Sequence, residues 1–400
     1  MLFHFICLPL HTNISTLEKK NKCSFLTFDH VAVCAMMVVL GKILLYISGI
    51  VSIFDPMKAA FDDFHLTDIF FEIQQNADSN YDNDIVIVDM TDLRTRDEIA
   101  QAITDIKSCK PKILGIDLIF ERPNFYDMDD VALVSALTTG DCQQVLSCKL
   151  RDYSVSEDSF KDCLYSFFRE AGDFEWGYTN YYQTRMGGLT RETSQSQLLN
   201  DSAVYSFSYL LACQYTDRPL VEKAVNKRQI MYSNVKFHVI GSNEIAQNAD
   251  KLRGKLVLLG AAKEETDMHF TPIGKMPGIE VIAYSITSYL RHGEIVRMDK
   301  TTSLLLAFVF CYIAAWMGYI MEKKSPIFFA ILAKLFNFFL MAVLIGVAFY
   351  AFFDHDYFIE LLYPLVGLTL VEDVRELYAG IIKWMAKTFH WECLSNSLYV

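Results

Sequence analysis

The sequence lacks the short motifs that mark the common nucleotide, metal and redox sites. It contains neither Gly-x-x-x-x-Gly-Lys-Ser/Thr nor Gly-x-Gly-x-x-Gly, so a phosphate-binding loop is not expected. Its ten cysteines include no Cys-x-x-Cys pair and no Cys/His set at zinc spacing. His238 and His269 have no Ser or Cys context that would suggest a catalytic triad. We therefore predict no catalytic set, no metal site and no cofactor.

An excess of positive charge is also missing. The 36 Lys and Arg residues are outnumbered by 48 Asp and Glu residues, which gives a formal net charge of −12. Residues 55–300 hold 38 of the acidic and 26 of the basic residues, so this segment carries the whole excess. An acidic surface repels phosphate backbones, and nucleic acid is therefore not an expected partner.

The cysteines of this acidic segment leave their redox state open. Five of them fall in residues 55–300, an odd number: Cys109, Cys142, Cys148, Cys163 and Cys213. If the segment faces an oxidising space, the three from position 142 to position 163 could supply one bridge. The alternative is that all are buried free thiols, which behave as small apolar residues.

Four apolar segments flank the acidic one. A bilayer core of about 30 Å needs about 20 apolar residues in a helix. Residues 31–54 meet this requirement with one interruption at Lys42, and residues 302–321 meet it without any charge. The last two, residues 327–353 and 357–371, complete the set, although the fourth is short. We predict a transmembrane helix in each, with a tight hairpin between the second and the third.

Basic residues predict the orientation of these helices. They occur before the first span, between the second and third spans, and after the fourth: Lys19, Lys20, Lys22, Lys323, Lys324, Arg375, Lys383 and Lys387. Such flanks face the cytoplasm, so residues 1–30 form a cytoplasmic segment and residues 55–300 lie outside. The prediction is a multi-pass protein of the cell inner (plasma) membrane whose first span also serves as an uncleaved signal anchor.

The segment after the fourth span is predicted to be a cytoplasmic amphipathic tail. This tail comprises residues 372–400. Residues 371–389 space apolar side chains at helical intervals, with Trp384 and Trp391 beside Lys383 and Lys387. Such a helix lies in the membrane interface or binds a partner.

The acidic segment alternates strands and helices. Ile85–Asp89 and Ile113–Phe120 are apolar runs typical of buried strands, and residues 96–109 between them have one apolar helical face. This order predicts a βαβ unit, hence parallel strands with a right-handed crossover.

The rest of the segment continues the α/β pattern. It predicts a helix after Asp127, a strand at 143–149, a hairpin and loop at 172–200, a helix at Ala203–Gln214, a hairpin at 229–240, a strand at Leu256–Leu259 and a helix at Gly278–His292. Buried parallel strands need cover on both faces, so the predicted fold is an α/β layered domain with a mostly parallel sheet.

Three stretches of this domain resemble a known family. IVIVDMTD, PKILGIDLIFERP and GKLVLLGAAKEETDMHFTPIGKMPGIEVIAYSITSYL occur in that order and lead into the apolar segments. Over roughly residues 60–371 the chain resembles the type 2 CHASE domain (CHASE2), the cyclase/histidine-kinase-associated sensory extracellular module. About three transmembrane helices follow that module in the family. The resemblance implies an extracytoplasmic sensory domain that relays a signal through these helices.

The chain departs from that family in two places. Ile282-Ala283 stands where the family commonly has His-Ala, so a polar role for that histidine is absent. The family usually attaches a cyclase, kinase or phosphodiesterase, and residues 372–400 are too few to fold into any of them. We therefore expect the output to come from a separate cytoplasmic or membrane signalling partner. The sequence also leaves open whether the protein forms a homodimer.

Three carboxylates are the candidate ligand-binding residues. Asp89, Asp117 and Asp267 lie at or just beyond the carboxyl ends of predicted strands, the sheet edge where α/β domains bind ligands. Together they could bind a small cation, amine or hydroxylated ligand. The alternative is that each is structural and accepts backbone N–H groups in a tight turn. An extracytoplasmic enzyme acting at this edge, or a structural subunit of a membrane complex, are the competing functions.

Overall fold

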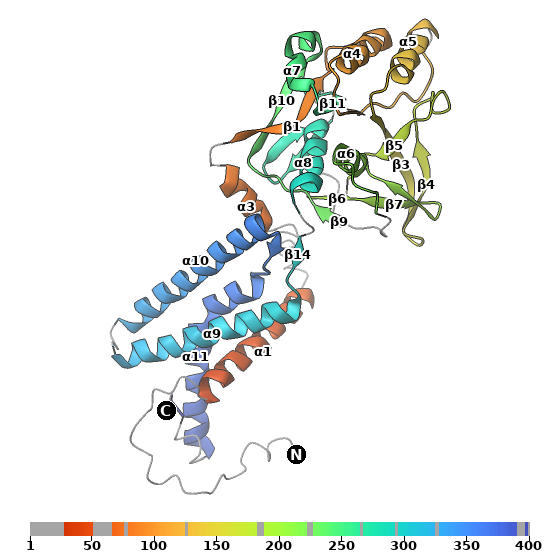
Figure 1. Cartoon of the computed structure of the whole chain (residues 1–400). Helices are drawn as coiled ribbons and strands as arrows, with labels where there is room; N and C mark the ends of the chain where they lie inside the picture. Colours follow the sequence, from red (N-terminus) through yellow and green to blue (C-terminus); the bar gives the residue numbers. More distant parts are fainter. Residues whose placement is uncertain are drawn as a thin grey trace. The chain divides into compact units, whose positions relative to one another are not determined.

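The structure is a computed structural model that describes residues 28–50, 66–75, 79–124, 127–181, 188–221, 227–264, 267–292, 295–324, 328–389 and 397–398. The chain divides into two compact units (Figure 1). Residues 60–295 form one, here called the α/β unit, and residues 1–59 with 296–400 form the other, the helical unit. The basic flank at Lys19, Lys20 and Lys22 lies outside the described residues.

The α/β unit is built on one large, mostly parallel sheet, as predicted. Nine strands take part in the order β10-β1-β11-β2-β3-β4-β7-β8, and β5 pairs with β3. Every pairing from β10 to β3, and that of β5 with β3, is parallel, whereas β4 and β8 each run antiparallel to a neighbour. In chain order the strands are β1 Asn80–Asp89, β2 Ile113–Ile116, β3 Gln144–Ser154, β4 Ser159–Leu164, β5 Glu175–Tyr178, β7 Ser196–Leu199, β8 Ser202–Tyr205, β10 Val235–Gly241 and β11 Leu256–Gly260.

Helices cover both faces of the parallel part of the sheet. On one face, α4 (Arg96–Ser108) and α5 (Asp127–Thr138) share an apolar core with Val86 and Val88 of β1. On the other face, α6 (Phe207–Tyr215) lies against β2, since a Cβ added at Gly115 would lie 2.7 Å from Leu211 Cδ1. Burial on both faces explains the unbroken apolar runs of these strands.

Helix α4 begins where its sequence signals it should. Thr95 caps the helix by accepting the Glu98 N–H at 3.2 Å, and the Glu98 carboxylate accepts the Thr95 N–H at 3.0 Å. This capping box satisfies two N–H groups that have no partner within the helix. The predicted helices 96–109, after Asp127, and 278–292 are confirmed by α4, α5 and α8 (Gly278–Arg291).

Three local predictions were wrong. Residues 229–240 are no hairpin, because β9 (Lys227–Gln229) pairs with β6 (Glu192–Ser194) while β10 pairs with β1. In the described parts of residues 172–200, which are 172–181 and 188–200, β5 joins β3 in parallel instead of forming the predicted hairpin. The helix expected from Ala203 begins at Phe207, because residues 202–205 form β8.

The smaller elements complete the α/β unit. Strands β12 (Met268–Thr271) and β13 (Gly274–Pro277) form an antiparallel hairpin directly before α8. The other elements are α3 Leu66–Gln75, η3 Ser242–Glu244, η4 Ala246–Asn248 and α7 Ala249–Leu252.

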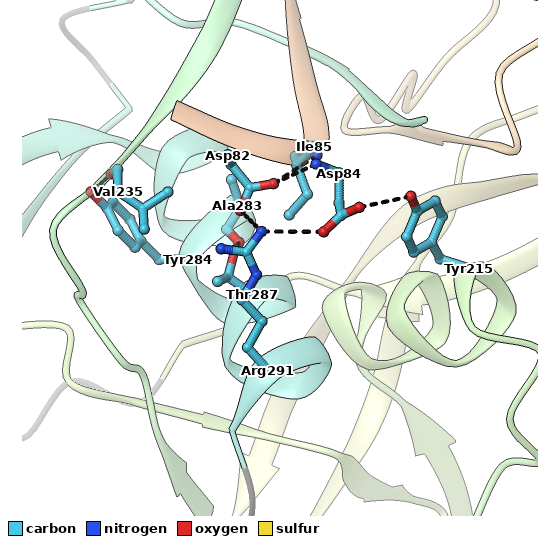
Figure 2. Close-up of polar contacts among 9 residues, drawn as sticks. All are labelled: Asp82, Asp84, Ile85, Tyr215, Val235, Ala283, Tyr284, Thr287 and Arg291. Atoms are coloured by element: carbon cyan, nitrogen blue, oxygen red, sulfur yellow. Dashed lines mark hydrogen bonds and ion pairs between the residues drawn. The ribbon is translucent and has the colours of Figure 1, made fainter. Parts of the chain in front are cut away.

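The last turn of α8 is fixed to the start of β1 by an ion-pair network (Figure 2). Asp82 accepts the N–H groups of Asp84 and Ile85 at 2.7 and 3.0 Å. The Arg291 guanidinium lies 2.7 Å from Asp82 Oδ2 and 3.2 Å from Asp84 Oδ2. The Tyr215 hydroxyl of α6 donates to Asp84 at 3.2 Å. The end of α8 is therefore connected to β1 of the sheet and, through Asp84, to α6, which covers the sheet.

The helical unit consists of long helices and one short strand pair. Its helices are α1 Phe28–Ile50, α9 Lys300–Lys324, α10 Phe329–His355 and α11 Leu362–Phe389, and β14 (Val296–Arg297) pairs in parallel with β15 (Tyr357–Phe358). Residues 300–324 and 331–355 are long and apolar enough to cross a membrane by length and composition. Within α1, residues 28–41 form a shorter apolar stretch. The predicted spans at 31–54 and 357–371 stay predictions.

Helix α11 packs against its neighbours through one face that includes charged residues. Its buried residues recur every three or four positions: Pro364, Gly367, Leu368, Val371, Glu372, Val374, Arg375, Tyr378 and Ile382. Arg375 is 2% exposed, and its guanidinium lies 2.7 Å from the carboxylates of Glu372 and of Glu322 in α9. Gly318 of α9 makes room for this group, since a Cβ there would lie 2.4 Å from Glu372 Oε1.

Candidate functional site

Asp117 lies directly after β2, at the carboxyl edge of the parallel strands. Its N–H donates to the Leu259 carbonyl of β11 at 2.9 Å, which continues the pairing of the two strands by one residue. Its side chain is half-buried. Burial, and next the nearby charge of Asp267, raise the pKa of Asp117 to about 6, against smaller opposing effects of Ser147, His269 and Lys149. In its ionised form, Asp117 therefore lowers the stability of the folded protein.

Asp267 lies between β11 and the β12–β13 hairpin, and it is the more exposed of the two carboxylates. Its side chain is 53% exposed, and its Oδ1 lies 3.6 Å from His269 Nε2. Its main-chain carbonyl accepts the Gly278 N–H at 2.9 Å, and a Cβ on Gly278 would lie 2.4 Å from Asp267 Oδ2. The carboxylate therefore lies at the amino end of α8. The nearby His269 ring lowers the pKa of Asp267 and outweighs the opposing effect of burial.

Other polar side chains surround this pair. The Thr190 hydroxyl lies 3.3 Å from His269 Nδ1, and the Tyr181 ring meets the His269 ring edge to face at 5.7 Å between centroids. The Tyr181 hydroxyl in turn lies 3.3 Å from the Ser285 hydroxyl of α8. Burial raises the pKa of Tyr181, and the charge of Asp117 contributes to the rise. Tyr181 therefore links the carboxylates to the middle of α8.

Sequence analysis missed Ser147, Lys149 and Tyr181. Ser147 and Lys149 lie two residues apart on β3, hence on the same face, and both act on Asp117. A serine and a lysine two residues apart in an otherwise apolar strand were a sequence signal from which both could have been predicted as site residues. Tyr181 carried no signal, because it follows β5 in a stretch without periodicity.

Asp89 has a different set of partners. One carboxylate oxygen accepts the Thr91 hydroxyl at 2.5 Å and the N–H groups of Thr91 and Ala262 at 3.0 Å. The other oxygen lies 2.9 Å from the Lys263 ammonium group. Burial would raise the pKa of Asp89, but these four interactions outweigh it and lower the pKa to about 2. Asp89 is 3% exposed and has the donors expected of a structural carboxylate.

The structure thus brings Asp117 and Asp267 together, and it gives Asp89 the separate task of tying the end of β1 to the loop after β11. The two carboxylates can accept hydrogen bonds from a small polar ligand. The neighbouring lysine, histidine and tyrosine can donate hydrogen bonds to it. Among the residues that the structure describes, no three His, Cys, Asp or Glu side chains are grouped so that they could hold a metal ion.

Comparisons with known proteins identify the family. The family model of the CHASE2 domain matches residues 37–320, which is more than two thirds of the chain. Comparisons with curated proteins and with solved structures give no match. The match covers the sheet, the carboxylate pair and most of helix α9, so the resemblance to the family that the sequence indicated is confirmed. The chain therefore belongs to the CHASE2 domain family, a family of extracytoplasmic sensory domains.

Proposed function

We propose that this protein is a membrane-anchored extracytoplasmic sensor in which Asp117 and Asp267 bind a small polar ligand. The observation that carries the proposal is the placement of a half-buried carboxylate, Asp117, near a second one at the ligand-binding edge of a parallel sheet. The raised pKa of Asp117 supports it, because a stability cost of this kind is typical of functional sites. A ligand that carries an ammonium or hydroxyl group would donate hydrogen bonds to these carboxylates.

Helix α8 offers the path by which binding reaches the helical unit. The site contacts α8 at its amino end through Asp267 and at its middle through Tyr181. The helix ends at Arg291, and α9 begins at Lys300. A ligand that favours one position of α8 would thus bias the segment that enters α9. Such a relay requires that the ligand bind the two states with different affinity, and the output is expected from a separate partner.

The ligand site predicts a defined result in thermal shift experiments. Full-length protein in detergent is screened against a panel of amino acids, polyamines and small sugars. We expect at least one compound to raise the melting temperature of the wild type. Asp117→Asn and Asp267→Asn should each abolish this rise. Without ligand, Asp117→Asn should have an unchanged or higher melting temperature, because its pKa is raised. Asp267→Asn should have a somewhat lower one, because its pKa is lowered.

The matched control for this screen is Asp141→Asn, the same chemical change at an exposed position. It should keep the full rise with ligand. The proposal fails if no compound shifts the wild type, or if Asp117→Asn responds as the control does.

The proposal includes a multi-pass topology. Lys323 and Lys324 end α9, and α9 and α10 are each long and apolar enough to cross a bilayer. In the proposed arrangement α1 and α11 also cross, both chain ends lie in the cytoplasm, and the α/β unit lies outside.

This topology predicts the labelling of single cysteines in intact cells. In a variant whose native cysteines are replaced, a cysteine at Asp201, in the turn between β7 and β8, should react with a membrane-impermeant maleimide. A cysteine at Lys387, in the last turn of α11, should react only after the cells are permeabilised. Labelling of the second position in intact cells, or protection of the first, would contradict the proposal.

A further inference from the structure

Two cysteines of the α/β unit are in contact. Strands β3 and β4 pair antiparallel with Leu150 opposite Cys163, so Cys148 and Cys163 lie diagonally across the pair on the same face. Both belong to one apolar cluster with Leu150 and Tyr178, and each thiol alters the pKa of the other. The two side chains thus lie next to each other on one face of the strand pair, the placement from which a disulfide can form.

The other cysteines of this unit have different partners. The Cys109 and Cys142 thiols donate to main-chain carbonyls, those of Asp105 at 3.3 Å and Gln143 at 3.4 Å. The Cys213 thiol lies near the Tyr209 hydroxyl of the same helix. The odd number of cysteines therefore divides into one contacting pair and three thiols occupied elsewhere.

The two contacting thiols differ in a way that suits a stepwise reaction. Cys148 is 4% exposed, whereas Cys163 is half-buried and accessible. The neighbouring Cys148 thiol, and then the Tyr165 hydroxyl and the Arg169 guanidinium, lower the pKa of Cys163 against the opposing effect of burial. Arg169 is held here by stacking over the Tyr165 ring at 3.9 Å. Cys163 is thus the better nucleophile, and Cys148 keeps its proton.

We propose that Cys148 and Cys163 form a disulfide by exchange with a small-molecule disulfide in the oxidising space outside the cytoplasm. The Cys163 thiolate attacks one sulfur of the reagent, forms a mixed disulfide and releases the first thiol. Cys148 then attacks the Cys163 sulfur, gives up its proton to the departing thiolate and releases the second thiol. The two protein thiols lose two electrons and two protons, and one disulfide reagent becomes two thiols.

The bond would join β3 to β4 at the residue between Ser147 and Lys149, both of which act on Asp117. The inference does not depend on the proposed ligand, because it rests on the contact between the two thiols. It uses only the extracytoplasmic location that the family has, where disulfides persist.

The experiment uses the full-length protein in detergent, first reduced and then exposed to glutathione disulfide. Remaining thiols are blocked with N-ethylmaleimide, and peptides are analysed by mass spectrometry without reduction. We expect one cross-link, between Cys148 and Cys163, and a melting temperature about 5 °C or more above that of the reduced protein. Cys163→Ser should remove both effects. The matched control, Cys213→Ser, should keep them.

Three results would overturn the proposal. The two thiols could both remain open to N-ethylmaleimide after oxidation, Cys163 could retain glutathione as a stable mixed disulfide, or Cys163 could be linked to Cys142 instead. Because these results are read on the wild type, they decide the question even if Cys163→Ser fails to fold. The ligand screen is independent, so failure of one proposal leaves the other testable.

Discussion

Replacing Arg375 with alanine is expected to lower the free energy of unfolding of the helical unit by about 3–5 kcal/mol. The guanidinium is 2% exposed and lies between the carboxylates of Glu322 and Glu372, at 2.7 Å from each. Without it, Glu372 would remain buried as an uncompensated charge beside a second carboxylate. Burying an unpaired charge is among the costliest changes a protein can suffer.

The loss is measured by hydrogen exchange of α9 and α11 peptides from the full-length protein in detergent, which separates this unit from the other. Lys387→Ala, an exposed change in the last turn of the same helix, should alter exchange little. Adding Glu372→Gln to Arg375→Ala should recover much of the loss, because the stranded charge is then gone. Equal exchange in Arg375→Ala and Lys387→Ala would show that the ion pairs contribute nothing.

Arg375 also shows why the sequence left the segment after the fourth apolar run open. Charged residues follow the apolar run near residue 371, so the segment could lie in the membrane interface or continue the last span as one helix. The structure has a continuous helix from Leu362 to Phe389. The charge of Arg375 in α11 is neutralised in part by Glu322 of another helix, α9. The periodicity of a single segment contains no information about such a partner.

The parallel strands were predictable because the residue pattern of each segment by itself indicates that the strand is buried. Ile85–Val88 and Leu256–Leu259 are apolar without alternation, which indicates cover on both faces. What the sequence could not predict is which strands are neighbours. β1 and β2 are joined by α4 and run parallel, but β11, far along the chain, lies between them. Short polar strands such as β6 and β9 were missed because their partners are also distant.

The candidate site was predictable only in part for the same reason. Asp117 and Asp267 stood out because each follows an apolar strand, and the structure brings them within electrostatic reach of each other. Asp89 stood out by the same rule, yet its four donors come from Thr91, Ala262 and Lys263. Position at a strand end therefore predicts where a carboxylate lies, whereas its partners, which decide its role, depend on loops that meet only in the folded chain.

The second large effect is expected at Asp89, where Asp89→Asn should destabilise the α/β unit by about 2–4 kcal/mol at pH 7.5. The charge of Asp89 is stabilised in the folded state, since its pKa falls from 3.8 to about 2. The amide of asparagine would lose the ion pair with Lys263 and would face donors with a weaker acceptor. The matched variant is Asp117→Asn, the same neutralisation at a carboxylate whose pKa is instead raised to about 6.

The two variants should therefore separate with pH in opposite directions. A lowered pKa gives stability that is present above about pH 4 and lost as the pH falls toward 2, so Asp89→Asn should approach the wild type only in that window. A raised pKa imposes a cost that is present above about pH 6 and absent below about pH 4, so Asp117→Asn should be the more stable protein at neutral pH, by up to about 3 kcal/mol before solvent screening. Hydrogen exchange of peptides covering β1 and β11, measured at several pH values, reports both differences. If Asp117→Asn destabilised the unit as Asp89→Asn does, Asp117 would be a structural carboxylate, and the ligand site would lose an observation that supports it, because the cost attributed to function would not exist.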